Sequence, residues 1–223
     1  MSDLAIYDLD RTVTRHATYT PFLLHCAARR SPWRLLLTPL AAASMLAYAA
    51  KVIDRGKLKE INHRLLLGRW IHPKDLKPLV DSFADATVAR NIRPGARKAI
   101  ARDKSEGRRL ILATASYRLY ADAIAGRLGF DDVIGTGSVI GLDDRIRSRI
   151  HGENAYGEAK LRMIAEWLDK SGLTGRHGHV RFYSDHASDE PTFNWVDEPV
   201  AVNPHGPLER LAKSRGWAIE DWG

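Results

Sequence analysis

The segment Leu4-Ala5-Ile6-Tyr7-Asp8-Leu9-Asp10-Arg11-Thr12 joins an apolar run to two closely spaced acids. Its first four residues form a short apolar run, which is typical of a buried parallel strand. The acids Asp8 and Asp10 follow directly where this strand is expected to end. Ligands of open parallel sheets bind beyond the carboxyl ends of the strands, so these acids are the first candidates for a functional site.

Strands and helices alternate after residue 91. A helix is expected from Pro94-Gly95 to Gly107, followed by a buried strand over residues 109–113. We expect further helices over residues 117–128 and 156–170, strands over 180–183 and 199–202, and a β excursion beside the sheet over 138–150. This alternation predicts an α/β fold, a doubly wound and mainly parallel sheet with helices on both faces.

The segment between the first strand and this alternation has a mostly helical pattern without strand-like alternation. We therefore expect an inserted helical cap over residues 17–91, with residues 1–16 and 92–223 forming the catalytic core. A chain of 223 residues is long enough for one sizeable core and a smaller insertion.

The chain is basic, with 34 Lys and Arg against 27 Asp and Glu and a formal charge of +7. This balance favours anionic partners, such as phosphorylated metabolites, anionic lipid or nucleic acid. The basic residues are scattered and accompany no DNA or RNA recognition motif, so no nucleic-acid partner is expected. Cys26 is the only cysteine, and the first ten residues carry acids where a secretory leader needs a basic and apolar pattern. A cytoplasmic location is predicted.

Four sites along the chain carry chemically reactive side chains. They are the DLDRT segment of residues 8–12, Thr114 in LILATAS, Lys160 in GEAK, and Asp185 with Asp189 in FYSDHASD. Their order and spacing resemble the four motifs of the haloacid dehalogenase-like hydrolase superfamily, in particular its phosphoserine-phosphatase-like branch, subfamily IB. One residue departs from the usual pattern, because Arg11 stands where a small residue such as glycine is more common.

The resemblance implies a role for each matched residue. Asp8 would be the nucleophile that forms a phospho-aspartyl intermediate, and Asp10 would be the general acid and base. Thr12, Thr114 and Lys160 would bind the substrate phosphate. A Mg²⁺ ion would be held by Asp8, the backbone carbonyl of Asp10 and Asp185, with Asp189 in support.

Elementary electrostatics also favours a cation among these acids. Two carboxylates about 4 Å apart repel by roughly 4 kcal/mol at an effective dielectric constant of about 20. Gathering Asp8, Asp10 and Asp185 therefore requires a positive partner. Mg²⁺ prefers oxygen ligands and suits a site with few carboxylates and a substrate phosphate.

Residues 35–50 form an uncharged apolar run that is shorter than the roughly 18 residues expected of a membrane span. A single crossing would also separate Asp8 from Lys160 and Asp185, so we do not expect a span. Two alternatives stay open. Helices over residues 19–28 and 35–50 either pack into an ordinary cap, or their basic and aromatic tip, residues 29–34, contacts an anionic membrane at its inner face.

The sequence thus predicts a Mg²⁺-dependent phosphomonoester hydrolase acting on a small phosphorylated metabolite or a lipid phosphate. A phosphotransferase differs only in whether water reaches the aspartyl phosphate, so it stays open. A catalytically silent regulator, which binds a membrane or protein partner through its basic cap, is the alternative from another functional class.

Overall fold

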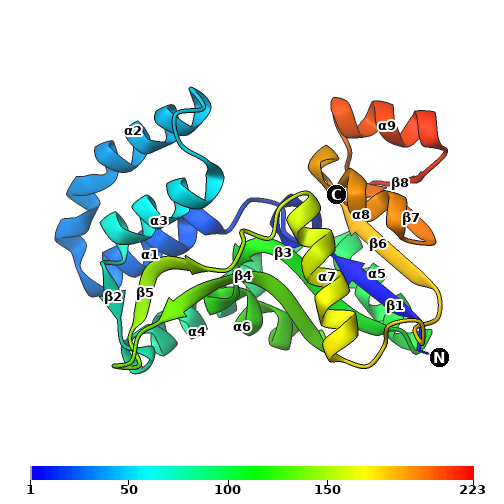
Figure 1. The fold of residues 1–223 in the computed structure, drawn as a ribbon, viewed down its shortest axis with the longest axis horizontal. Helices are drawn as coiled ribbons and strands as arrows, with labels where there is room; N and C mark the ends of the chain where they lie inside the picture. Colours follow the sequence, from blue (N-terminus) through cyan, green and yellow to red (C-terminus); the bar gives the residue numbers. More distant parts are fainter. Residues whose placement is uncertain (1) are drawn as a thin grey trace.

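A computed structural model describes residues 2–223, which build a mixed sheet of eight strands in the order β2-β5-β4-β3-β1-β6-β7-β8 (Figure 1). The strands are β1 (Leu4–Tyr7), β2 (Trp70–Ile71), β3 (Arg109–Tyr117), β4 (Asp132–Ile140), β5 (Ile146–His151), β6 (Val180–Ser184), β7 (Glu198–Val202) and β8 (Ala218–Glu220). In the sheet, the neighbouring strands of the series β4-β3-β1-β6-β7-β8 all pair in parallel. Strand β5 is antiparallel to both β4 and β2. The sheet is mainly parallel, as predicted.

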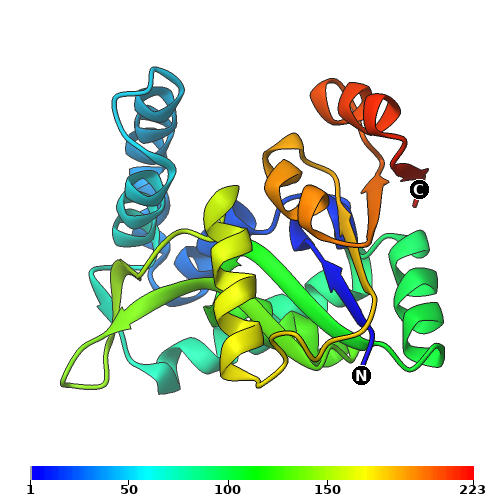
Figure 2. The same ribbon diagram turned by 45° about the vertical axis from the view of Figure 1, so that its right-hand side comes forward.

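Helices cover both faces of the sheet (Figure 2). One face carries α4 (Pro73–Arg90), α5 (Pro94–Ser105) and α6 (Arg118–Leu128), and the other carries α7 (Glu158–Lys170), α8 (Glu190–Trp195) and α9 (Pro207–Arg215). Side chains of β1 alternate between the two resulting cores: Ala5 and Tyr7 enter the first, and Leu4 and Ile6 enter the second. This arrangement confirms the predicted doubly wound α/β fold.

The segment after β1 is mostly helical and lies at one end of the molecule (Figure 1). It contains α1 (Tyr19–Arg30), the 3₁₀ helix η2 (Pro32–Leu37), α2 (Thr38–Ala49) and α3 (Arg55–Leu66), followed by the short β2 and by α4. Within residues 2–223, the structure contains no helix with the length and apolar character that a membrane crossing requires. The exact limits of core and cap remain a prediction.

The two ends of this segment lie side by side. Thr14 and Ile92 form an isolated antiparallel bridge. The backbone nitrogen of Arg15 donates to the Asn91 carbonyl at 2.7 Å, and that of Arg93 donates to the Val13 carbonyl at 3.0 Å. The chain therefore leaves the core and returns to it at one point.

The strand β4 begins at Asp132, earlier than the β excursion predicted from residue 138. Two glycines weaken the strand pattern in this stretch. A Cβ on Gly135 would lie 3.2 Å from the carbonyl oxygen of Ser116, where β3 bulges between Thr114 and Tyr117. A side chain at this position would crowd the bulge, where the two backbones come close together, so glycine is favoured.

Candidate active site

The strand β1 delivers Asp8 to the carboxyl edge of the sheet. All four β1 residues are buried, and the backbone nitrogen of Asp8 extends the pairing by donating to the Tyr183 carbonyl at 2.9 Å. The chain then turns sharply through a short segment, η1 (Leu9–Val13), in which Asp10 and Arg11 are not helical and Arg11 has φ of 66°. A non-glycine residue in this left-handed region costs about 1 kcal/mol, which explains why glycine suits the position better.

Asp8 and Asp189 share the ammonium group of Lys160. Lys160 Nζ donates to Asp8 Oδ1 at 2.8 Å and to Asp189 Oδ2 at 2.7 Å, and all three side chains are buried. Ser184 Oγ also donates to Asp189 Oδ2, at 2.6 Å. A lysine at the start of α7 is thereby fixed between the loops that follow β1 and β6.

This cluster perturbs the protonation of its members. Burial raises the pKa of Asp8 to about 7, with Asp189 and Asp185 adding to the rise and Lys160 opposing it. Burial lowers the pKa of Lys160, but Asp189 and Asp8 outweigh that effect and raise it above its usual value. Lys160 is therefore charged at neutral pH, and one ammonium group does not fully neutralise the surrounding acids.

Asp185 is tied to the same cluster through Thr12. The backbone nitrogen of Asp185 donates to Thr12 Oγ1 at 2.9 Å, and this hydroxyl lies 3.1 Å from Asp185 Oδ1 and 3.4 Å from Asp8 Oδ2. Burial raises the pKa of Asp185. Asp8 and Asp185 thus come from distant parts of the sequence and stand on either side of one hydroxyl group.

Asp10 lies in a second group of hydrogen bonds. Its Oδ1 accepts from the backbone nitrogen and the hydroxyl of Thr18, both at 2.6 Å, and its Oδ2 accepts from Ser116 Oγ at 2.6 Å. The Tyr120 hydroxyl donates in turn to Ser116 Oγ at 2.7 Å. These donors hold the carboxylate of Asp10 in one orientation.

Thr114 connects to this second group at the bulge of β3. Its Oγ1 accepts from the backbone nitrogen of Ser116 at 3.0 Å, so its hydroxyl hydrogen is directed elsewhere. The structure therefore places the sequence-predicted residues in two groups: Asp8, Thr12, Lys160, Asp185 and Asp189 in the first, and Asp10 with Thr114 in the second.

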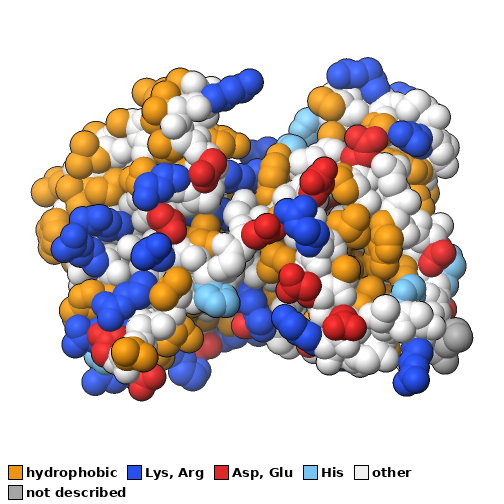
Figure 3. Space-filling model, viewed as in Figure 1, with side chains coloured by type: hydrophobic (Ala, Val, Ile, Leu, Met, Phe, Trp, Pro, Cys, Tyr) orange, Lys and Arg blue, Asp and Glu red, His pale blue; other side chains and the backbone are white. Residues whose placement is uncertain are grey.

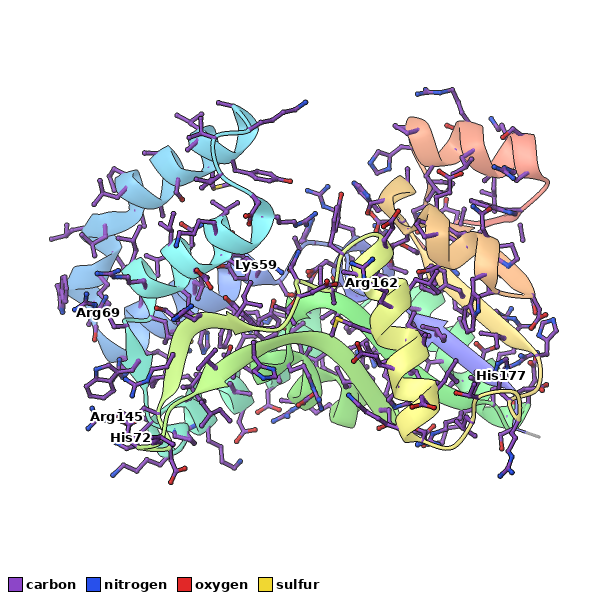
Figure 4. All side chains as sticks on the ribbon, viewed as in Figure 1. Lys59, Arg69, His72, Arg145, Arg162 and His177 are labelled. Carbon is purple, nitrogen blue, oxygen red and sulfur yellow. The ribbon has the colours of Figure 1, made fainter. Side chains whose placement is uncertain are left out.

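Lys59 on α3 is a polar residue of this region that the sequence did not reveal. Figure 4 labels it on the cap, and its ammonium donates to the Ala115 carbonyl and, at 2.5 Å, to Asn154 Oδ1. Thr136 Oγ1 donates to the same Ala115 carbonyl at 2.7 Å. Burial lowers the pKa of Lys59 to about 7; nearby Arg55 lowers it further and Asp10 opposes this.

Four residues were missed by sequence reasoning: Thr18, Ser116, Tyr120 and Lys59. Ser116 was inside the LILATAS segment, so its position next to Thr114 was a usable signal. The sequence around Lys59 gave no such signal, because Arg55, Lys57 and Lys59 together look like the solvated basic face of a helix.

The acidic cluster offers oxygen ligands for a hard cation. Across the part of the chain that the structure describes, no three His, Cys, Asp or Glu side chains gather as a complete metal site. A site of two carboxylates and one backbone carbonyl needs only two acidic side chains, and Asp8 and Asp185 both contact the hydroxyl of Thr12. Among residues 2–223, Asp189 Oδ1 is buried and finds no hydrogen-bond partner. This surplus of buried acceptor oxygens fits Mg²⁺.

A family model described as haloacid dehalogenase-like hydrolase matches residues 5–194. This match spans most of the chain, from β1 into α8. The chain belongs to the haloacid dehalogenase-like hydrolase family. It is an enzyme, a hydrolase of the phosphatase type. The silent-regulator alternative receives no support from the comparisons.

Curated relatives of this hydrolase carry phosphatase names. A histidinol-phosphatase of Neisseria meningitidis serogroup C is 30% identical over 138 residues, covering 61% of this chain and 62% of that protein. The phosphoserine phosphatase SerB1 of Mycobacterium tuberculosis is 28% identical over 223 residues, covering 98% of this chain and 70% of that protein. The hydrolase therefore spans about two thirds of the length of these relatives.

Solved structures share the fold of the hydrolase. A Bordetella pertussis protein of unknown function superposes with a TM-score of 0.90 at 24% identity, and each chain is covered completely. A phosphoserine phosphatase with a phospho-aspartyl intermediate analogue superposes with a TM-score of 0.61 at 14% identity, covering 98% of this chain and 92% of that one. At these identities the likeness establishes the fold alone.

Proposed function

We propose that this hydrolase is a Mg²⁺-dependent phosphomonoesterase that forms a phospho-aspartyl intermediate on Asp8. The observation that carries the proposal is the position of Asp8, a buried carboxylate at the end of β1 between Lys160 and Thr12. The pKa of Asp8 is about 7, and further positive charge in the site would favour its ionised form, the carboxylate that acts as nucleophile.

In the first half of the reaction, a carboxylate oxygen of Asp8 bonds to phosphorus and the bond from phosphorus to the ester oxygen breaks. Asp10 in its protonated form gives its proton to the departing alkoxide. In the second half, water gives a proton to Asp10 and attacks phosphorus, and the bond to Asp8 breaks. Thr18 and Ser116 hold Asp10 in place for both proton transfers.

Two further residues are proposed to stabilise the transferred phosphoryl group. The charged ammonium of Lys160 supplies a fixed positive charge, and the Thr114 hydroxyl supplies a hydrogen-bond donor. Thr12 is proposed to assist phosphate binding from η1 while its hydroxyl orients Asp185.

The proposed Mg²⁺ ligands are Asp8, the backbone carbonyl of Asp10 and Asp185, with Asp189 in support through Lys160. When bound, Mg²⁺ neutralises phosphate oxygens that would otherwise repel the Asp8 carboxylate. The surplus of buried acidic oxygens over the single ammonium of Lys160 supports this assignment.

We propose a small phosphorylated metabolite as the substrate, with a lipid phosphate as the second candidate. The first candidate is supported by the names of two relatives, a histidinol-phosphatase and a phosphoserine phosphatase. The second follows from the exposed apolar residues of the cap.

An aryl phosphate, whose leaving group needs little protonation, separates the two half-reactions. Wild-type protein should release phosphate with Mg²⁺ and lose that activity in EDTA. Asp8→Asn should be inactive and should incorporate no labelled phosphate. Asp10→Asn should still incorporate label but release it slowly, because the attacking water lacks its base.

The matched control is Asp132→Asn, which alters a partly exposed acid on the same sheet and should keep full activity. Turnover by Asp8→Asn comparable to the control would exclude Asp8 as the nucleophile. A screen of soluble and lipid phosphomonoesters then identifies the substrate.

A further inference from the structure

The solvent face of α2 is apolar, which is unusual for a surface helix. Between Pro39 and Ala49 the helix carries no charged residue, and it is buried only at Ala41 and Ser44. Surface helices normally present charged side chains to solvent and apolar ones to the core. Here the apolar side chains face outward, and an exposed apolar surface of this kind marks a site of interaction.

The exposed residues extend beyond α2 into the flanking segments. Their exposed fractions are 59% for Trp33, 81% for Leu36, 56% for Leu40, 72% for Leu46 and 75% for Val52. We name this set, together with Met45, the apolar cap face. Figure 3 shows hydrophobic side chains gathered at the end of the molecule that α2 occupies, with Lys and Arg beside them.

The charges around the apolar cap face are mainly positive, with exposed Asp54, two residues after Val52, as the acidic exception. The sequence contains no Asp or Glu between Asp10 and Asp54. Arg29, Arg30 and Lys51 are exposed beside the face, and within the described residues 2–223 none of them forms an ion pair. The face and its rim therefore combine exposed apolar surface with uncompensated positive charge.

We propose that the apolar cap face docks on an anionic lipid bilayer. With 12 residues, α2 is about 18 Å long, which is shorter than a bilayer core of about 30 Å, so it lies in the interface plane. Its apolar side chains enter the boundary of the acyl chains, and the three cations contact anionic headgroups. Each cation near such a surface strengthens binding by about fivefold.

A second copy of this chain fits the face less well. In a symmetric dimer the same patch meets itself, which would bring the unpaired cations of both copies together. The face also offers almost no hydrogen-bonding side chains, whereas protein interfaces carry such groups around their apolar centre. The composition therefore favours lipid.

In the described part of the chain, helix α2 packs on α3 and η2, and not on the elements that carry the proposed catalytic residues. Ser44 packs inward and donates to Asn62 Oδ1 at 2.8 Å, so α3 separates α2 from the core. Lys59 on the same α3 contacts the Ala115 carbonyl of the core. Docking through α2 therefore does not depend on the proposed catalytic roles, and it can be tested separately.

Co-sedimentation with vesicles tests the proposal. The full chain should pellet with phosphatidylcholine vesicles containing phosphatidylglycerol and should stay in solution with pure phosphatidylcholine. The triple variant Leu36→Gln, Leu40→Gln, Leu46→Gln should bind anionic vesicles at least tenfold more weakly. Replacing Arg29, Arg30 and Lys51 by Gln should also weaken binding, by about fivefold for each charge.

Three controls separate docking from folding and catalysis. The Leu triple variant should retain wild-type turnover of an aryl phosphate, because its residues are exposed and lie outside the site. Ile219→Gln, on β8 at the opposite end of the molecule (Figure 1), should bind vesicles as wild type does. Asp8→Asn should also bind them normally.

Two results would overturn the proposal. The first is no pelleting with anionic vesicles, or pelleting that the Leu triple variant retains. The second is a lipid-free dimer, seen by analytical ultracentrifugation, that this variant dissociates, since the face would then belong to a second copy.

Discussion

The hydroxyl of Thr12 lies 2.9 Å from the backbone nitrogen of Asp185 and 3.1 Å from its Oδ1, across 173 residues of sequence. This contact fixes the loop after β1 against the loop after β6. It also keeps Asp185 beside Asp8, whose Oδ2 is 3.4 Å from the same hydroxyl. One small side chain therefore sets the spacing of the two acids on which the proposed metal site depends.

Replacing Thr12 by valine should loosen that spacing. The variant keeps the shape of the side chain but leaves the buried N–H of Asp185 without an acceptor, at a cost of about 1–3 kcal/mol. We expect activation by Mg²⁺ to require about 10- to 100-fold more metal. A Mg²⁺ titration of aryl phosphatase activity measures this, and Thr12→Ser should behave almost as wild type.

Lys160→Met should impair both stability and activity. It leaves the buried carboxylates of Asp8 and Asp189 without their shared cation, which costs about 3–5 kcal/mol at neutral pH. Turnover should fall by about 100- to 1000-fold. Lys170→Met, in the same helix but paired on the surface with Glu166, should change the free energy of unfolding by less than about 1 kcal/mol. Similar urea midpoints for the two variants would contradict the prediction.

A buried acid outside the candidate site, Asp103, stabilises the core. Asp103 on α5 accepts hydrogen bonds from Tyr7 and Tyr183 and pairs with Arg181, and it is completely buried. Asp103→Asn should lower the free energy of unfolding by about 1–3 kcal/mol, because the buried hydrogen bonds of Asp103 are weakened and Arg181 keeps only its more exposed partners Glu198 and Glu106. The partly exposed pair of Arg109 and Asp132 gives the contrast, since Asp132→Asn should cost only about 1 kcal/mol.

Lys59 should make stability depend on pH. Its pKa in the folded state is about 7, lowered by burial and by Arg55 from 10.5. Between these two values the unfolded state binds more protons than the folded state, so stability should rise with pH from about 7 toward 10. Below pH 7 the lysine is charged in both states, so it adds no pH dependence to the stability.

Chemical denaturation at several pH values measures the Lys59 effect. Relative to Lys59→Gln, the free energy of unfolding of the wild type should increase by about 2 kcal/mol between pH 7 and 9. Lys57→Gln, two residues along the same helix and exposed, should keep the wild-type slope. Parallel profiles for wild type and Lys59→Gln would refute the assignment.

The sequence was most informative where burial and chemistry change abruptly. The run Leu4–Tyr7 is buried on both faces, so a strand ending at Asp8 was predictable from four residues. Asp185 also follows a buried strand, β6, and parallel strands bring their carboxyl ends to one edge of the sheet. For this reason the neighbourhood of Asp8 and Asp185 could be predicted without coordinates.

Hydroxyl and lysine partners could not be predicted in this way. Thr18 contacts both Asp10 and the hydroxyl of Tyr120 because the start of α1 lies beside α6, and no sequence pattern records that packing. The early start of β4 was missed because Gly135 lacks strand propensity, although it suits the close approach of the bulge in β3. In both cases tertiary contacts override the local signal.

The antiparallel bridge between Thr14 and Ile92 has a consequence for how this protein can change. Because the intervening chain starts and finishes at neighbouring points, its length has little influence on the entropy of closing the sheet. Helix α2, which packs on α3 and η2, can be lengthened, shortened or exchanged while the catalytic strands keep their register, whereas α4 and β2 belong to the core and the sheet. The cap can therefore change, and with it the choice of substrate, while the catalytic residues of the core keep their positions.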